Sequence, residues 1–186
     1  MKKIAFFAFV LILGQGAFSQ DSLWPPLDNS PMDMAYYPVD YPLLKIKKST
    51  IDPPMVRVIY SRPQVKGRVI FGELVEYGKV WRLGANEDTE IEFFKDARIG
   101  NTKIKKGKYS LFAIPYQDKW TIILNRDLDS WGAFAYDQKK DVLRTDVKIE
   151  KNDPVEAFTM VFVKSGNGAN LVIAWENIKT VLPISF

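Results

Sequence analysis

Histidine and cysteine are both absent from the 186-residue sequence. Without histidine, the protein lacks the most common general base, the most common transition-metal ligand and every histidine-activated nucleophile. Without cysteine, thiol catalysis, zinc–thiolate sites, iron–sulfur clusters and disulfides are excluded. We therefore expect no cofactor and no metal site. The chemistries that these absences leave open are carboxylate catalysis, a lysine or tyrosine base and an oxygen-ligated hard cation. Binding without catalysis is also left open.

Other catalytic and nucleotide-binding signatures are also missing, including G-x-S-x-G, S-x-x-K, G-x-x-x-x-G-K and an EF-hand loop. The formal net charge is only +4, and Lys2 and Lys3 belong to a segment that we expect to be removed. The mature chain is then close to neutral. Because phosphate neutralisation supplies most nucleic-acid affinity, we expect no nucleic-acid partner.

Residues 1–19 have the pattern of a secretory signal peptide. Two lysines precede the apolar stretch IAFFAFVLILG, which is too short to span a bilayer comfortably. The small residues Ala17 and Ser19 fit the −3 and −1 positions of a cleavage site, so we expect cleavage after Ser19. The mature protein is expected to be soluble, without a membrane span, and periplasmic or secreted.

Residues 20–54 contain seven prolines, which argue against a regular helix or a central strand there. The aromatic residues and methionines between Met32 and Tyr41 are too apolar for a solvated linker. We interpret this segment as an extended arm across the surface of the domain. A disordered tail is the alternative.

From Met55 onward, apolar and polar residues alternate with the period of two that is typical of half-buried strands. With a high aromatic content and no amphipathic helix, this indicates an antiparallel sandwich or barrel. We predict an all-β antiparallel sandwich over residues 55–186, with one helical turn between 131 and 144 and a hairpin turn at Asn167-Gly168. The alternating segments are 56–61, 89–94, 120–124, 157–163 and 171–175.

Tyr109 begins one of the apolar strands, two residues after Gly107. This spacing is that of the tyrosine corner of Greek-key sandwiches, in which the hydroxyl bonds to backbone upstream of its own strand. An ordinary hairpin tyrosine is the alternative interpretation.

Two loops carry the candidate ligand-binding residues. Arg62 and Arg68 flank a turn that follows the strand ending at Ser61, and their planar donor groups suit a carboxylate or phosphate. The stretch GKVWRLGANEDTEIEF, residues 78–93, adds a possible stacking residue, a cation, polar groups and an acid: Trp81, Arg82, Asn86, Glu87 and Thr89. The alternative is that these residues only hold loops together.

The segments YSRPQVKGR and GKVWRLGAN, together with KKGKYSLFAIP and the C-terminal LVIAWENIKTVLPI, resemble the bacterial family known as domain of unknown function 2911. The resemblance covers roughly residues 30–186. It implies a small exported β-rich protein and no particular reaction. It also implies that the family signature includes Arg62, Pro63, Arg68, Trp81, Arg82, Asn86 and Thr89.

We therefore predict an exported binding or envelope-associated protein with a polar pocket between the two loops. Its partner would be a small polar or anionic ligand, or an envelope protein. One alternative is a glycan hydrolase with Glu87 and one of Asp88, Asp137 or Glu176 as its acid pair. Another is a structural subunit that docks on a partner through its aromatic arm.

Overall fold

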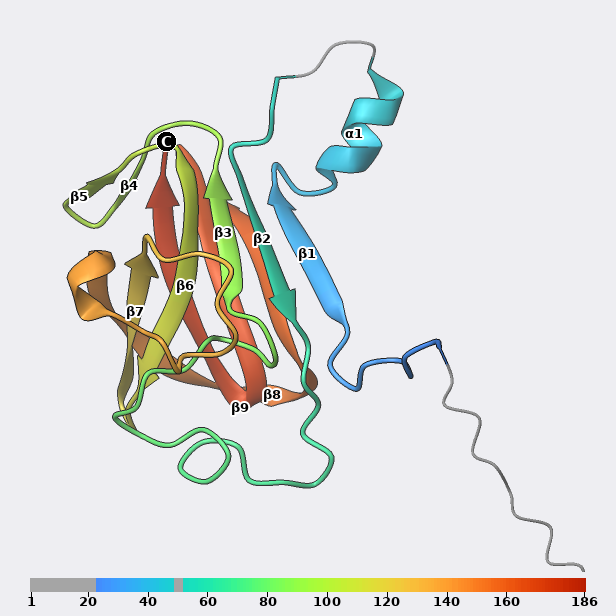
Figure 1. Cartoon of the computed structure of the whole chain (residues 1–186). Coiled ribbons are helices and arrows are strands. Elements are labelled where there is room, and N and C mark those ends of the chain that lie inside the picture. The colour runs from blue at the N-terminus through green and yellow to red at the C-terminus, as the bar shows by residue number, and fades with distance from the viewer. Residues whose placement is uncertain (1–22, 49–51) are drawn as a thin grey trace, which may run out of the picture.

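The structure, a computed structural model, describes residues 23–48 and 52–186 (Figure 1). The predicted signal peptide and its cleavage site lie outside the described residues. The described chain is dominated by antiparallel strands, with one short α-helix and one 3-10 helix at Gln138–Lys140. The other elements are β1 (Met32–Tyr37), α1 (Tyr41–Lys47), β2 (Val56–Ser61), β3 (Thr89–Phe93), β4 (Ala97–Ile99), β5 (Thr102–Ile104), β6 (Gly107–Pro115), β7 (Lys119–Asn125), β8 (Asp141–Ser165) and β9 (Gly168–Ser185).

The strands join into a single sheet in the order β1-β2-β3-β6-β7-β8-β9-β4-β5. The first part of β8 pairs with β7, and β8 also pairs with β9 along most of its remaining length. Register shifts on either side of Val155 interrupt the β8–β9 ladder, and such irregularities bend strands. The all-β antiparallel class is confirmed. A Greek-key sandwich stays a prediction, because all described strands belong to one sheet.

The sheet curves back so that β2 faces the second part of β8, which lies behind β2 and β3 in Figure 1. The Tyr60 hydroxyl donates a hydrogen bond to the Met160 carbonyl oxygen at 3.2 Å and accepts one from the Met160 N–H at 3.0 Å. The rings of Tyr60 and Phe158 pack edge to face with centroids 5.8 Å apart. The alternating apolar residues of β2 and β8 therefore share one core.

The centre of this core is a cluster of large aromatic side chains. Trp81 stacks on Trp175 with ring centroids 5.9 Å apart and meets Trp120 edge to face at 5.7 Å. Phe71 and Phe158 complete the cluster. Burying side chains of this size contributes much of the hydrophobic stabilisation of a domain that has no disulfide.

The proline-rich arm is more regular than we predicted. Strand β1 pairs with β2 along its whole length, from Met32 opposite Ser61 to Tyr37 opposite Val56, so the arm extends the sheet as an edge strand. The expectation that the prolines exclude a regular helix is wrong at α1. Pro42 lies in the first turn of α1, where its missing N–H would have had no intrahelical partner. The boundary predicted at residue 55 stays a prediction, although β1 belongs to the same sheet as the strands beyond it.

One of two predicted local motifs is present as predicted, and the other is shifted by one residue. The Tyr109 hydroxyl donates to the backbone oxygen of Lys105 at 2.9 Å, upstream of its own strand as the tyrosine-corner spacing predicts. A tight hairpin joins β8 to β9, with Ser165 paired to Gly168, so Gly166 and Asn167 are the turn residues rather than Asn167 and Gly168. Gly166 has a φ of 52°, and a positive φ at the first turn position suits glycine.

Among the described residues, no helix is long and apolar enough to cross a membrane.

Candidate functional site

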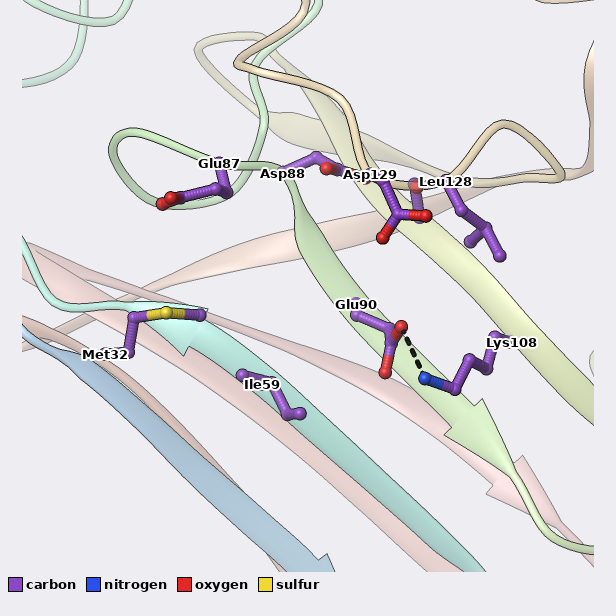
Figure 2. A pocket seen from close by; sticks show the side chains of 9 residues that line it. Met32, Ile59, Glu87, Asp88, Glu90, Lys108, Leu128 and Asp129 are labelled. Atoms are coloured by element: carbon purple, nitrogen blue, oxygen red, sulfur yellow. Dashed lines mark hydrogen bonds and ion pairs between the residues drawn. The ribbon is translucent and has the colours of Figure 1, made fainter.

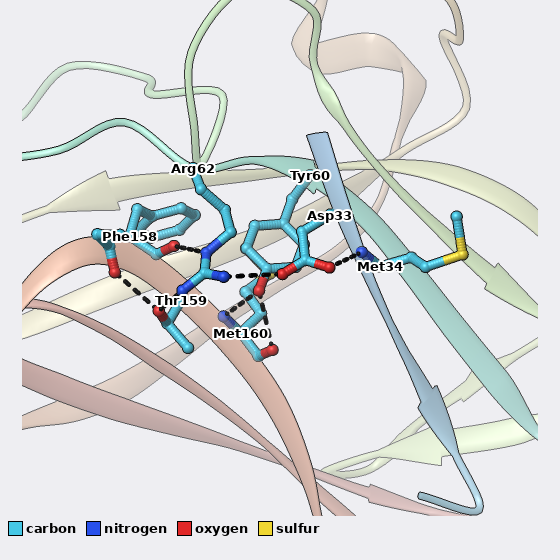
Figure 3. A network of polar contacts seen from close by, with 8 residues as sticks. Asp33, Met34, Tyr60, Arg62, Phe158, Thr159 and Met160 are labelled. Carbon is cyan, nitrogen blue, oxygen red and sulfur yellow. Dashed lines mark hydrogen bonds and ion pairs between the residues drawn. The ribbon is translucent and has the colours of Figure 1, made fainter. Parts of the chain in front are cut away.

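Each of the three guanidinium nitrogens of Arg62 bonds a group within the protein (Figure 3). Its Nε donates to the Phe158 carbonyl oxygen at 3.2 Å, and its two terminal nitrogens bond Asp33 and Thr159, each at 3.0 Å. One guanidinium thus ties the edge strand β1 and the end of β2 to β8. Arg62 has the contacts of a residue that holds elements together.

Arg68 holds its own loop in shape. Its Nε donates to the Val65 carbonyl oxygen at 3.0 Å, and Nη2 donates to the carbonyl oxygen of Gln64. Its remaining terminal nitrogen, Nη1, bonds no described residue. Arg68 therefore combines a loop-closing contact with one unused donor.

Trp81 and Thr89 are both buried. Trp81 is 8% exposed, and its indole N–H donates to the Gly84 carbonyl oxygen at 3.1 Å. The Thr89 hydroxyl donates to the Leu83 carbonyl oxygen at 2.6 Å. These bonds close the loop that precedes β3, and Trp81 belongs to the core cluster rather than to an open stacking surface.

Asn86 and Glu87 lie on the outer side of the same loop. Asn86 has a φ of 61°, and its side-chain amide donates to the Asp28 carboxylate at 3.0 Å, which ties the loop to the arm. Glu87 pairs through its backbone with Trp131, and its side chain is exposed. Within the described residues, neither side chain forms a hydrogen bond or an ion pair with Arg62, Arg68 or Arg82.

Arg82 differs from the other candidate residues because its guanidinium has no partner. Its Nε is buried, and the side chain makes no hydrogen bond or ion pair with any described residue. Burial lowers the pKa of the Arg82 guanidinium. Because Nε is removed from water without a hydrogen-bond partner, this part of the guanidinium carries an uncompensated desolvation cost.

Arg82 and Arg68 line one pocket of about 250 Å³, which we call the arginine pocket. No aspartate or glutamate is among the residues that line it. Ser30 contributes a hydroxyl, and the remaining wall is largely apolar. The other lining residues include Pro63, Leu74, Val75, Trp81 and Trp175. The two loops that carry the predicted candidates thus meet here, while Arg62, Asn86, Glu87 and Thr89 do not line the pocket.

The loop after residue 130 approaches Arg82 from outside. A Cβ placed on Gly132 would lie 3.2 Å from Arg82 Nη1 and 3.1 Å from the Phe134 ring, so a side chain there would press on both. Trp131 and Phe134 are 61% and 87% exposed, and they do not seal the core. Tyr136 does pack inward against Phe112 at 5.4 Å. Sequence reasoning did not connect Gly132 with Arg82, since nothing in the local pattern indicates this approach.

A second pocket, of about 380 Å³, gathers acidic side chains above β3 and β6 (Figure 2). Glu90 in it pairs with Lys108 at 3.1 Å. Burial raises the pKa of Asp88, while hydrogen bonds from Ser110 and the Ser130 backbone oppose the shift. The acids that line this pocket are Glu87, Asp88, Glu90 and Asp129.

Of the acid pairs considered for a hydrolase, the fold brings one into a shared pocket and separates the other two. Glu87 and Asp88 line the acidic pocket, whereas Asp137 and Glu176 do not. The Asp137 carboxylate accepts a hydrogen bond from the Lys139 N–H at 2.9 Å, and Glu176 lies in β9 opposite Val155. In the described part of the chain, no group of three or more acidic side chains is arranged to hold a metal ion.

Comparison with known proteins identifies a family and nothing further. No curated protein and no solved structure matches the chain. The family model described as "Protein of unknown function (DUF2911)" matches residues 43–184, a slightly shorter range than the resemblance in the sequence suggested. The match includes β2 to β9 and both arginine-bearing loops. The chain therefore belongs to the DUF2911 family of proteins of unknown function.

Proposed function

We propose that this protein is an exported binding protein that takes a small anionic ligand in the arginine pocket. The ligand group is a carboxylate or a phosphate, and Arg82 is the residue that binds it directly. The observation that carries this proposal is the unpartnered guanidinium of Arg82, whose Nε is buried in a pocket lined by no acid. The localisation rests on the signal-peptide pattern of residues 1–19.

An anion would remove the energetic penalty at Arg82. A guanidinium has five N–H donors and stays protonated in proteins, so it cannot relieve its burial by losing a proton. An unsatisfied buried polar group typically costs about 1–3 kcal/mol, and a charged one costs more. A carboxylate or phosphate accepts two parallel hydrogen bonds from one guanidinium, which fits this donor set.

Arg68 supplies a second positive charge to the same pocket. Its loop-closing bonds to Gln64 and Val65 fix the orientation of the guanidinium, so little side-chain entropy would be lost when Nη1 binds a ligand. Positioned donors of this kind give specificity as well as affinity.

The other wall of the pocket favours a ligand with an apolar part. Leu74, Val75 and Trp175 line the pocket beside the two arginines. Apolar lining with a few placed polar groups is the usual composition of a small-molecule site. A volume of about 250 Å³ suits a small organic acid or phosphate ester rather than a polymer.

Replacing Arg82 with leucine tests the proposal. A thermal-shift screen with phosphate, sulfate and small carboxylic acids should raise the melting temperature of the native protein. At a ligand concentration one hundred times Kd, the added stability would be about 2.7 kcal/mol. Arg82→Leu should abolish this stabilisation, because the direct anion contact is lost.

The variant should also fold at least as well as the native protein in anion-free buffer. Removing a half-buried cation whose Nε has no partner among the described residues is expected to leave the free energy of unfolding unchanged or to raise it by about 1 kcal/mol. Arg98→Leu is the matched control, because exposed Arg98 makes a single side-chain hydrogen bond within the described part of the chain, to the Asn101 carbonyl oxygen. If Arg82→Leu unfolds the protein, or if both variants keep the anion response, Arg82 is not the ligand-binding residue.

A further inference from the structure

Helix α1 presents an apolar face to solvent. At about 100° per residue, Pro42, Leu43 and Ile46 fall within an arc of about 100° on one side of the helix. Leu43 is 54% exposed and Ile46 is 81% exposed. Tyr41 and Leu44, on the opposite side, are half-buried, and Tyr41 stacks on Tyr36 of β1 at 5.8 Å. Apolar side chains therefore lie on both sides of α1, and those of one side are left exposed to solvent.

Lysines border this apolar face on both sides. Lys45 and Lys47 lie about 60° and 40° beyond its two edges, and Lys48 follows at the C-cap. None of the three ammonium groups forms a hydrogen bond or an ion pair with any described residue. Asp40 is the only acid between residues 40 and 48, and it lies at the other end of the helix. The surface thus combines unpaired positive charge with exposed apolar side chains.

The helix is also placed where a large planar partner could reach it. It projects at one corner of the molecule, beyond the end of β1 and away from the loops that follow β2 (Figure 1). Val39, which is 51% exposed, adds an apolar side chain next to the helix. We call the surface formed by Val39, Leu43, Lys45, Ile46, Lys47 and Lys48 the α1 patch.

The charge of the α1 patch decides which partner fits it. A symmetric dimer would bring two copies of the same unpaired lysines together, which like-charge repulsion disfavours. Aliphatic side chains flanked by lysines match the interface of an anionic bilayer, where the apolar groups enter the acyl boundary and the ammonium groups meet lipid phosphates. We infer that the α1 patch docks this protein on an anionic lipid surface.

Vesicle binding provides the test. The chain from Gln20 onward should be used, because it contains every described residue and lacks the apolar stretch that would enter lipid by itself. It should co-sediment with vesicles of equal parts phosphatidylglycerol and phosphatidylcholine but not with pure phosphatidylcholine vesicles. Binding should fall as salt is raised, since each lysine acts through a screened surface potential.

Two variants examine the two halves of the α1 patch. Lys45→Gln/Lys47→Gln should lower the partition coefficient by on the order of tenfold or more, from about 1 kcal/mol per lysine. Leu43→Ser/Ile46→Ser should lower it at unchanged charge. Both variants should keep the native melting temperature, because no residue of α1 is buried.

Lys103→Gln/Lys105→Gln is the control for charge alone. These two lysines are 59% and 71% exposed on the β4–β5 hairpin, where both pair with Asp96. This control should bind anionic vesicles like the native protein. The inference is overturned if the native protein does not co-sediment with anionic vesicles, or if both α1 variants bind them as the native protein does. Either result would favour an acidic protein as the partner of the α1 patch.

Discussion

At the scale of single residues, the same side chain has different roles according to which remote groups reach it. Arg62 and Arg82 both follow apolar segments and both look available in the sequence. Every guanidinium nitrogen of Arg62 makes a hydrogen bond because β1 and β8 bring Asp33, Thr159 and the Phe158 carbonyl oxygen to it. Arg82 has no partner among the described residues, and none of the acids they include lines its pocket. Residue type and spacing could nominate both arginines, but only the packing of distant strands distinguishes them.

Tyr109 gives a prediction at this scale. Tyr109→Phe removes the hydroxyl that bonds the Lys105 carbonyl oxygen at 2.9 Å, and the side chain is 8% exposed. The free energy of unfolding should fall by about 1 kcal/mol, the net contribution of a typical hydrogen bond. Urea denaturation measures this change. An unchanged midpoint would mean that the bond contributes nothing to the corner.

At the scale of secondary-structure elements, the period of two predicted β2, β3 and β7 with only small errors at their ends. The strands β8 and β9 were predicted only as the short pieces 157–163 and 171–175. They continue through irregular positions such as Val155 and Glu176, where the register shifts and Glu176 takes a φ of 55°. Such irregularities break the alternation that identifies a strand, so the full lengths could not be predicted.

In the proline-rich arm, the sequence pattern concealed regular elements altogether. Prolines on both sides of β1 and in the first turn of α1 hid two regular elements. Strand β1 is regular because β2 offers it a complete ladder, a tertiary effect that local propensity does not contain.

A substitution at Gly168 measures how closely the two ends of β9 pack against each other. A Cβ at Gly168 would lie 1.9 Å from the Ile184 carbonyl oxygen, near the far end of the same strand. Gly168→Ala should therefore cost at least about 1–3 kcal/mol, because the backbone must move to admit the methyl group. Thermal or urea unfolding would measure the loss.

Gly166→Ala is the matched comparison on the same hairpin. Gly166 has open space around its Cβ position and only a positive φ of 52°, so alanine should cost about 1 kcal/mol of strain. If the two variants lose equal stability, the contact between the two ends of β9 is not what requires Gly168.

At the scale of the whole molecule, the two proposed surfaces lie at opposite ends. The arginine pocket is formed by loops beyond the end of β2, whereas α1 lies beside the beginning of β2 (Figure 1). A protein docked through the α1 patch would hold its pocket away from the lipid and open to solvent. This arrangement would suit a protein that collects a small ligand near a membrane without blocking its own pocket.

At this scale we predict that anion binding in the arginine pocket and lipid binding by the α1 patch are independent of each other. Substitutions at distant sites without shared partners usually have additive effects. Arg82→Leu should leave vesicle partitioning unchanged, and Lys45→Gln/Lys47→Gln should leave the anion-induced thermal shift unchanged. Measuring each variant in both assays tests this. A loss of both activities in either variant would indicate coupling through the sheet or a single shared site.

The stacked indoles of Trp81 and Trp175 have a further, optical consequence. Both rings line the arginine pocket, and both lie within 6 Å of other aromatic rings in the core. Indole emission depends on the local electric field, so an anion that binds at Arg82 would alter the emission of this pair. Trp24 and Trp131 are both exposed, and a soluble quencher such as iodide can silence them. The protein thus carries an intrinsic fluorophore at its pocket, and ligands can be sought without attaching a dye.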